Sequence, residues 1–419
     1  MNEEKKLVPK LRFPEFRWTG EWRLAPLNQL AKRTKKKNRD ETITRVLTNS
    51  AEFGVMDQRD FFDKDIATQG NLESYYVVEL GSYVYNPRIS STAPVGPISK
   101  NKVGTGVMSP LYTVFKFKDD GNEFYEHYFK TTGWHTYMRQ ASSTGARHDR
   151  MAISSDDFMA MPMPVSSPAE QQKIADCLSS LDELIAAQAR KVDALKTHKK
   201  GLMQQLFPRE GETQPRLRFP EFRDAGAWEP KTLGEVVEIA SGQVDPTRQP
   251  YCDLPQIGSE NIQSDSGKLV DVKSARDKGV ISGNYAFDEN DVLYSKIRPV
   301  LNKSAAPAFK GICSADIYPI RPANTGLMRI YLLYLLLSPR FLDYAISKSE
   351  RGKIPKINRD DLLSFEAIIP PPLEQQRIAD CLTALDTFIT TATQELATLK
   401  THKKGLMQQL FPSAEAVES

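Results

Sequence analysis

The sequence predicts an α+β protein that is an internal duplication, with two mixed α/β domains alternating with two long helices. The main observation is an exact repeat. Fourteen residues, 195–208 (LKTHKKGLMQQLFP), recur unchanged at 399–412, which is 204 positions later in a chain of 419 residues. A long stretch that occurs once in each half of a chain indicates two equivalent halves.

Two further observations extend the repeat. Residues 170–178 match residues 374–382 at the same offset, and residues 11–16 (LRFPEF) reappear at 217–222. The blocks between these repeats, about 20–165 and 226–369, are similar in length and largely different in sequence. The predicted domains are therefore a first variable domain at 1–166, a helix at 167–208, a second variable domain at 209–370, a helix at 371–412 and a tail at 413–419.

The composition is that of an ordinary soluble protein. The chain is 40% hydrophobic and 26% charged, and its length suits two globular domains. It has no apolar run of membrane-spanning length, and its first residues lack the apolar core of a signal peptide, so a cytoplasmic protein is expected. Cys177 and Cys381 are copies within the repeat, and Cys252 and Cys313 have no metal-ligand spacing. The sequence thus predicts neither disulfides nor a metal site.

The repeated element is predicted to be a long helix. Apolar residues recur at alternating steps of four and three, the a/d pattern of a heptad repeat. In the first copy these positions are Ile174, Leu178, Leu181, Ile185, Gln188, Val192, Leu195, Lys199, Leu202 and Leu206. In the second copy they are Ile378, Leu382, Leu385, Ile389, Ala392, Leu396, Leu399, Lys403, Leu406 and Leu410. Each helix is expected to begin just after a proline and to end at Phe-Pro, giving a rod of about 55 Å.

Two helices with narrow apolar stripes are expected to pack against each other. An antiparallel pair is favoured because a pseudo-twofold axis then makes the two halves equivalent. The alternative is that each helix packs only on its own domain, as an ordinary amphipathic helix does. Lys199 and Lys403 lie on the apolar stripe and argue against a dry, continuous core at that level.

The two variable blocks are expected to share a fold. In the first block, residues 83–85 and 111–117 predict strands and residues 124–140 a helix; in the second, residues 292–294 and 312–320 predict strands and residues 327–346 a helix. Both blocks end in a similar way, with Arg147 and Arg351, and Ile153 and Ile357, 204 positions apart. Such blocks would be one scaffold that presents two different binding faces.

Several motifs together resemble those of one family. Each long helix opens with Pro-x-Glu-Gln-Gln-x-Ile-Ala, at 168–175 and 372–379, and residues 228–242 and 291–298 (WEPKTLGEVVEIASG and DVLYSKIR) add to this pattern. With a variable domain before each helix, the chain resembles the specificity (S) subunit of type I restriction-modification systems over essentially its whole length.

The resemblance implies two target recognition domains, similar to that of a DNA adenine methyltransferase, held apart by an antiparallel coiled coil. It implies that each domain reads one half of a bipartite, asymmetric target in double-stranded DNA. It also implies partners: two modification (M) subunits, which carry S-adenosylmethionine and methylate adenine, and restriction (R) subunits. No cofactor is expected in this chain, and no membrane partner.

Candidate DNA-binding residues are cations and small polar residues, because arginine can bind guanine bidentately while lysine, serine and threonine mostly hold phosphate. Residues 32–39 hold six cations in eight positions, although such a run is more often a solvated loop. In the first domain the candidates are Lys32, Arg33, Lys35, Lys36, Lys37, Arg88, Ser91, Thr92, Thr144 and Arg147. In the second they are Ser295, Lys296, Arg298, Lys303, Arg351, Lys353 and Lys356. Arg147 and Arg351 are a matched pair and are equally compatible with a structural role.

Partner subunits are expected to dock on the repeated helices, since two copies of one subunit require two equivalent surfaces. The candidates are Lys196, His198, Lys200 and Gln204, with their copies Lys400, His402, Lys404 and Gln408. The alternative is that identity here reflects recent duplication or helix packing alone.

A catalytic role is not supported by the sequence. An amino-methyltransferase needs an Asn/Asp-Pro-Pro-aromatic motif, and residues 86–89 (NPRI) lack its second proline and its aromatic residue. No ATP-binding loop or zinc-protease motif is present. The chain is therefore expected to be a non-enzymatic DNA reader. The alternatives are a duplicated coiled-coil scaffold that binds no DNA, and a stand-alone methyltransferase with an unrecognised active site.

Overall fold

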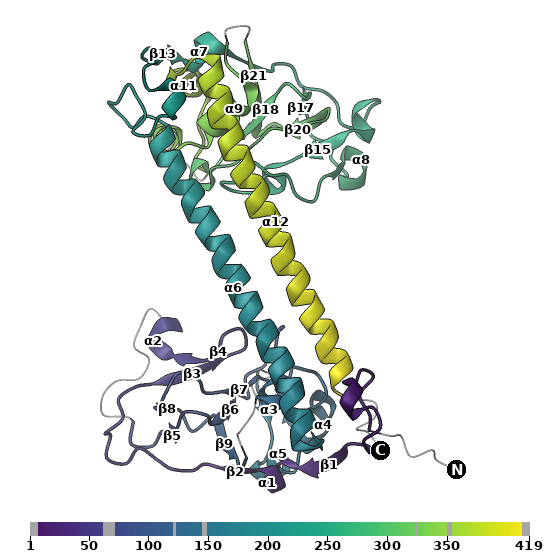
Figure 1. Cartoon of the computed structure of the whole chain (residues 1–419). Helices are drawn as coiled ribbons and strands as arrows, with labels where there is room; N and C mark the ends of the chain where they lie inside the picture. The colour runs from purple at the N-terminus through teal and green to yellow at the C-terminus, as the bar shows by residue number, and fades with distance from the viewer. Residues whose placement is uncertain are drawn as a thin grey trace. The chain divides into compact units, whose positions relative to one another are not determined.

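The structure is a computed structural model, and it describes residues 7–61, 72–119, 123–144, 149–323, 326–349 and 354–412. The chain forms two compact units (Figure 1). Unit 1 comprises Met1–Gln188 and Glu395–Ser419, and unit 2 comprises Ala189–Gln394. Each unit therefore contains one variable block and one half of each long helix.

The two long helices are α6 (Pro168–Leu206) and α12 (Pro372–Leu410), each of 39 residues. Both begin at a proline, which suits the first helical turn because the N–H groups there have no partner within the helix. In the described residues every predicted stripe position is buried or half-buried. The predicted long helices, their heptad stripe and their ends at Phe-Pro are thus confirmed.

Within each unit the two helix halves run antiparallel, as predicted. In unit 1, Lys403 Nζ lies 2.5 Å from Asp182 Oδ1, and Gln188 Nε2 donates to Glu395 Oε2 at 2.8 Å. As residue numbers increase along α6, the numbers of their partners in α12 decrease, so the two helices are antiparallel. In unit 2, Lys199 Nζ lies 2.7 Å from Asp386 Oδ1, which is the copy of the Lys403–Asp182 pair.

Each helix half also packs on the variable domain of its own unit. Ile174 and Leu178 of α6 and Leu410 of α12 belong to the buried core of unit 1. Leu206 of α6 and Leu382 of α12 belong to the core of unit 2. Packing between helices and packing on a domain therefore occur together, and were not alternatives.

The variable domain of unit 1 is built on a four-stranded sheet in the order β2-β9-β6-β7, with small strand pairs β1-β12, β3-β4, β5-β8 and β10-β11. The strands are β1 (Arg23–Pro26), β2 (Ala31–Arg33), β3 (Leu47–Ser50), β4 (Gly54–Asp57), β5 (Tyr76–Val78), β6 (Tyr83–Tyr85), β7 (Ile98–Lys100), β8 (Gly106–Met108), β9 (Thr113–Phe117), β10 (Ser143–Thr144), β11 (Met151–Ala152) and β12 (Pro162–Val165). The short helices are η1 (Pro14–Phe16), α1 (Leu27–Leu30), α2 (Gln58–Phe61), α3 (Phe124–Phe129), α4 (His135–Ala141) and α5 (Ser155–Met159).

Unit 2 has sheets in the orders β14-β21-β18-β19 and β16-β15-β20-β17, and the pair β13-β22. Its strands are β13 (Glu229–Thr232), β14 (Val237–Ile239), β15 (Pro255–Ile257), β16 (Lys273–Ser274), β17 (Asn284–Phe287), β18 (Val292–Ser295), β19 (Ser304–Ala305), β20 (Gly311–Ser314), β21 (Ile317–Pro322) and β22 (Glu366–Ile369). Its helices are η2 (Pro220–Phe222), α7 (Leu233–Val236), η3 (Tyr251–Asp253), η4 (Ser259–Asn261), α8 (Ala275–Lys278), η5 (Pro299–Leu301), α9 (Arg329–Leu336), α10 (Pro339–Lys348) and α11 (Arg359–Leu363).

The two variable domains share a strand order. The first sheet of unit 1, β2-β9-β6-β7, corresponds strand for strand to β14-β21-β18-β19 in unit 2. The second sheet of unit 2 has a parallel contact between β15 and β20, and unit 1 keeps this contact as the parallel bridge between Val46 and Val107. The predicted scaffold, common to two blocks of different sequence, is thus present.

Three predicted elements differ from the structure. The helix predicted at 124–140 is two helices, α3 and α4, with a turn at 131–134 that includes Gly133. The helix predicted at 327–346 is divided into α9 and α10 at Pro339, where Ser338 caps the second helix by accepting a hydrogen bond from Phe341 N. Helix α9 ends before Pro339 because a proline lacks the N–H that a continuing helix needs. The strand predicted at 312–320 is divided into β20 and β21 by a turn.

A buried carboxylate ties each variable domain to its helix. Glu170 at the start of α6 accepts hydrogen bonds from Arg12 Nε at 2.6 Å and Trp22 Nε1 at 3.0 Å. Glu374 at the start of α12 accepts from Arg218 and Trp228 in the same way, at 2.8 and 3.1 Å. The repeated LRFPEF and EQQ motifs therefore meet in space, and a buried charge is tolerated because it is fully paired.

Candidate functional site

The candidate site is a pair of segments that occurs once in each unit. In unit 1 the loop after β6 (residues 86–97) pairs with residues 149–151: Ile89 N donates to Asp149 O at 3.0 Å, and Met151 N donates to Pro87 O at 2.9 Å. In unit 2 the loop after β18 (residues 295–303) pairs with residues 354–357 through equivalent bonds, Arg298 N to Pro355 O at 2.7 Å and Ile357 N to Lys296 O at 3.0 Å. We call these the loop pairs of units 1 and 2.

The loop pairs bring together residues that were predicted from separate parts of the sequence. In unit 2 the loop carrying Arg298 lies beside the segment carrying Lys356, through the bridge between Ile297 and Lys356. In unit 1 Arg88 forms the equivalent bridge with Arg150. Arg147, Arg351 and Lys353 lie outside the described residues.

The loop pair of unit 1 borders a cleft of about 430 Å³. Arg88 and Arg150 contribute to its lining, and both lie 3.8 Å from a carboxylate oxygen of Asp149. Among the candidates, Ser91 and Thr92 are exposed on the loop, and Thr144 is in β10. Arg150 was not among the residues predicted from the sequence. The repeat could have indicated it only weakly, because Arg150 and its counterpart Lys356 are 206 positions apart, whereas the main repeat has an offset of 204.

The loop pair of unit 2 presents some of its candidates to solvent and uses others internally. Arg298 and Lys356 are exposed, whereas Ser295 is buried and its hydroxyl lies 2.9 Å from Ser259 Oγ. Lys303 Nζ donates to Ser259 O at 2.7 Å. Lys296 is half-buried, with its ammonium 5.1 Å from the centre of the Tyr318 ring.

The basic run at 32–39 is an extended segment rather than a free loop. Its first part is strand β2, and Lys36 O then accepts a hydrogen bond from Val77 N at 2.8 Å. Lys32, Lys35, Lys36 and Lys37 are exposed. Arg33 is half-buried and donates to Ser155 Oγ. None of these residues lines the cleft of unit 1.

The candidate partner residues are all exposed. Lys196, His198, Lys200 and Gln204 are exposed in unit 2, and Lys400, His402, Lys404 and Gln408 are exposed in unit 1. The intervening Lys199 and Lys403 are buried against the partner helix. Each unit therefore presents the same set of exposed side chains, with the histidine on the opposite side of the buried stripe from the other three.

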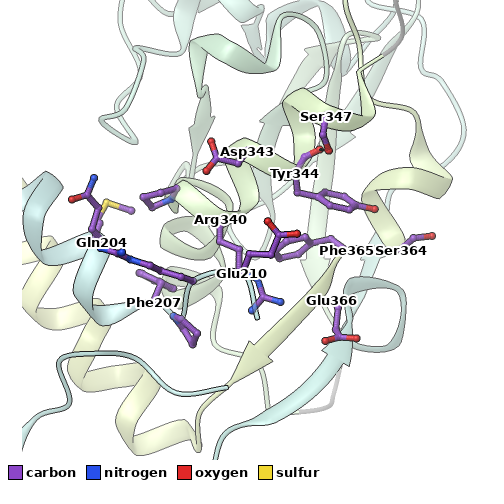
Figure 2. Close-up of a pocket in the computed structure, with 14 residues that line it drawn as sticks. Gln204, Phe207, Glu210, Arg340, Asp343, Tyr344, Ser347, Ser364, Phe365 and Glu366 are labelled. Carbon is purple, nitrogen blue, oxygen red and sulfur yellow. Dashed lines mark hydrogen bonds between the residues drawn. The ribbon is translucent and has the colours of Figure 1, made fainter. Parts of the chain in front are cut away.

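A second hollow lies in unit 2 where α6 ends. Figure 2 shows its lining, with Gln204 from the last turn of α6, Phe207 directly after that helix, and Arg340, Asp343 and Tyr344 from α10. Its volume is about 690 Å³. The lining mixes charges of both signs, so it does not by itself define a ligand.

Three other features bear on function: metal sites, membrane-spanning helices and disulfides. The described residues contain no group of three or more His, Cys, Asp or Glu side chains placed to hold a metal. In the same residues, no helix combines the length and apolarity needed to cross a bilayer. All four cysteines are free thiols.

The chain is a duplicated protein in which one scaffold carries different residues on two equivalent loop pairs. Comparison with known proteins gives a family match for part of it. Residues 226–401 match the family described as "Type I restriction modification DNA specificity domain".

Relatives extend the likeness beyond residues 226–401. The chain is 26% identical over 285 residues to the EcoDI specificity subunit of Escherichia coli, covering 62% of this chain and 63% of that protein, which is less than two thirds of its length. It is 24% identical to the MjaVIII specificity subunit of Methanocaldococcus jannaschii, covering 75% of this chain and 74% of that protein. The predicted resemblance to type I specificity subunits is therefore confirmed.

A solved structure shares the fold. The type I restriction-modification S subunit of M. genitalium has a TM-score of 0.57 and 12% identity, covering 97% of this chain and 100% of that one. The predicted fold class, two mixed α/β domains with two long antiparallel helices, agrees with this neighbour.

Proposed function

We propose that the chain is the DNA-recognition subunit of a type I restriction-modification complex. Each variable domain would read one half of a bipartite, asymmetric target in duplex DNA, and the paired helices would fix the distance between the halves. The observation that supports this most strongly is the pair of equivalent loop pairs. They share hydrogen bonds and position, but their exposed side chains differ, as expected of two readers of different sequences.

The candidate residues of this proposal fall into three groups: those suited to bases, those suited to phosphates, and those that support the loops. Arg88 and Arg150 in unit 1, and Arg298 in unit 2, have the guanidinium groups that can bind guanine O6 and N7. Lys35, Lys36, Lys37 and Lys356 are exposed ammonium groups suited to phosphate. Ser295 and Lys303 are assigned a supporting role, since their polar atoms already bond Ser259.

Catalysis would belong to separate subunits. In this proposal two modification subunits carrying S-adenosylmethionine dock on the exposed helix residues around Lys196 and Lys400, and restriction subunits join the assembly. The two equivalent sets of exposed residues support two copies of one partner, because each unit presents the same residues in the same order. The chain itself would bind and position DNA, in the cytoplasm.

The direct test is to map methylated adenines across the genome of a host that expresses the chain with its modification subunit. The expected result is one motif with two unlike halves separated by an unread spacer. Symmetric halves, or methylation without a motif, would contradict the proposal. The scaffold alternative predicts no methylation and no salt-dependent binding to duplex DNA, and methylation by the isolated chain would favour the stand-alone enzyme.

A further inference from the structure

The turn at the tip of the unit 2 loop pair has an unusual composition for an exposed loop. It is the short helix η5, whose Val300 is 68% exposed and whose Leu301 is 39% exposed. Ile354, on the paired segment, is 50% exposed. These three aliphatic side chains, with the exposed Arg298 and Lys356, are called the tip patch.

The turn is held in one conformation. Arg298 precedes it with φ +48° and Asn302 follows it with φ +45°, a left-handed backbone that side-chain-bearing residues rarely adopt. Asn302 is buried, and its Nδ2 donates to Asp265 Oδ1 at 2.7 Å and to Leu337 O at 3.1 Å. The η5 turn also packs against α10. Val300 is thus presented outward by a fixed support, rather than by a freely moving loop.

The charges beside the tip patch favour DNA as its occupant. Arg298 and Lys356 are both exposed, on the two adjacent segments of the loop pair. At the base of the turn, Asp265 accepts a hydrogen bond from Asn302. Lysine is depleted at the centres of protein–protein interfaces, whereas exposed cations beside a reading element suit phosphates.

The aliphatic members of the tip patch need an apolar partner. In the major groove of DNA, the apolar group on a base edge is the C5-methyl of thymine. We infer that Val300, with Leu301 beside it, contacts a thymine methyl group in the half-site read by unit 2. This inference rests on the proposed function and adds the chemical group that one domain reads.

Unit 1 provides an internal contrast. The corresponding turn is Ser90–Ala93, closed by hydrogen bonds from Ser90 N to Ala93 O at 3.0 Å and from Ala93 N to Ser90 O at 3.2 Å. Its exposed residues, Ser90, Ser91 and Thr92, all carry hydroxyl groups. DNA affinity is therefore expected to depend on a thymine methyl group in the half-site read by unit 2, and not through the corresponding turn in the half-site read by unit 1.

The test uses the full chain with its modification subunits and a duplex bearing the mapped target. Each thymine is replaced in turn by deoxyuridine, which lacks only the C5-methyl group. Affinity is expected to fall about fourfold per contacted methyl, at one or two positions within one half. Val300→Ala should lower affinity for the thymine duplex by a similar factor and abolish the difference between thymine and deoxyuridine there.

Ile281→Ala is the matched control, because Ile281 is an exposed aliphatic residue in another loop of unit 2; it should keep the full difference. The inference is overturned if the unmodified complex is indifferent to deoxyuridine, if Val300→Ala keeps the difference, or if that half has no A·T pair. It is also overturned if Val300→Ala weakens subunit assembly instead of DNA binding. Sequence-specific binding without a methyl effect removes only this inference, whereas absence of sequence-specific binding removes the proposed function.

Discussion

Lys199 on α6 donates to both carboxylate oxygens of Asp386 on α12, at 2.7 and 2.9 Å. The same pair recurs 204 residues along as Lys403 and Asp182. The lysine that interrupts each apolar stripe therefore pairs across the helices, which explains how the seam tolerates a charge. Their surroundings differ, since the Asp386 side chain is 19% exposed and that of Asp182 is 42% exposed.

This difference predicts unequal costs for removing the two lysines. Lys199→Met should lower the free energy of unfolding by about 2 kcal/mol. The half-buried Asp386 then keeps the hydrogen bond from Tyr334 Oη and the nearby charge of Lys268, but it loses its ion pair. Lys403→Met should cost about 1 kcal/mol or less, because water reaches Asp182. Urea denaturation measures both. The exposed Lys196→Met serves as control, and a larger cost at Lys403 would refute the explanation.

His127 predicts a pH dependence for unit 1. The side chain is buried, and its Nε2 lies 3.1 Å from Ser179 Oγ. Burial, with the nearby charges of Lys130, Lys403 and Lys102, lowers the His127 pKa to about 3, although Asp182 acts in the opposite direction. A folded-state pKa below the unfolded value of about 6.5 means that the unfolded chain takes up the proton first as the pH falls.

The stability that neutral His127 provides is therefore complete above about pH 6.5 and is lost progressively as the pH falls towards 3. At pH 5 the loss is about 2 kcal/mol. His127→Gln should remove this part of the pH dependence while keeping an amide for Ser179. The measurement compares the free energy of unfolding of both proteins at pH 7.5 and 5.0. His135, whose pKa is lowered to about 4 by burial and Arg139, contributes equally to both; parallel curves would refute the role of His127.

The features that could be predicted from the sequence depend on residues close together in the chain. The four-and-three spacing of apolar residues predicted both long helices, and the prolines predicted where they begin, because both signals involve neighbours within one or two helical turns. The loop pairs were less accessible. Pro87 and Met151 meet only through strand pairing between distant segments, and no local pattern encodes such a register. For the same reason the sequence does not indicate that Arg150 lies beside Arg88, and it places Ser295 among the DNA-binding candidates although the fold buries it.

The basic run predicts a steep salt dependence of DNA binding. Replacing Lys35, Lys36 and Lys37 by alanine should reduce the slope of log affinity against log salt by about 2 to 3, if each ammonium contacts one phosphate. Arg33→Gln is the contrasting variant. Its guanidinium already donates to Ser155, so it should affect stability more than the slope. An unchanged slope in the triple variant would remove the run from the DNA contact.

Exchange of one domain should change one half of the target. Residues 20–165 from a relative with another motif carry the loop pair of unit 1, whose bonds all lie within that block. The chimera is therefore expected to methylate a motif with a new first half and the original second half. Mapping methylated adenines in cells that express the chimera measures this, and a change in both halves would contradict independent reading.

Symmetric lengthening of the helices should change only the spacer. Along the sequence, the midpoint between Asp182 and Lys199 falls near Arg190 in α6, and the midpoint between Asp386 and Lys403 falls near Gln394 in α12. One heptad inserted after Arg190 and one after Gln394 keeps every existing pair in register. Each insertion lengthens its helix by about 10 Å, or about three base pairs of DNA. The expected motif keeps both halves and has a longer spacer, whereas a heptad in α6 alone should destroy methylation because the pairs of one unit lose their register. Altered halves with an unchanged spacer would show that the helices do not set the distance.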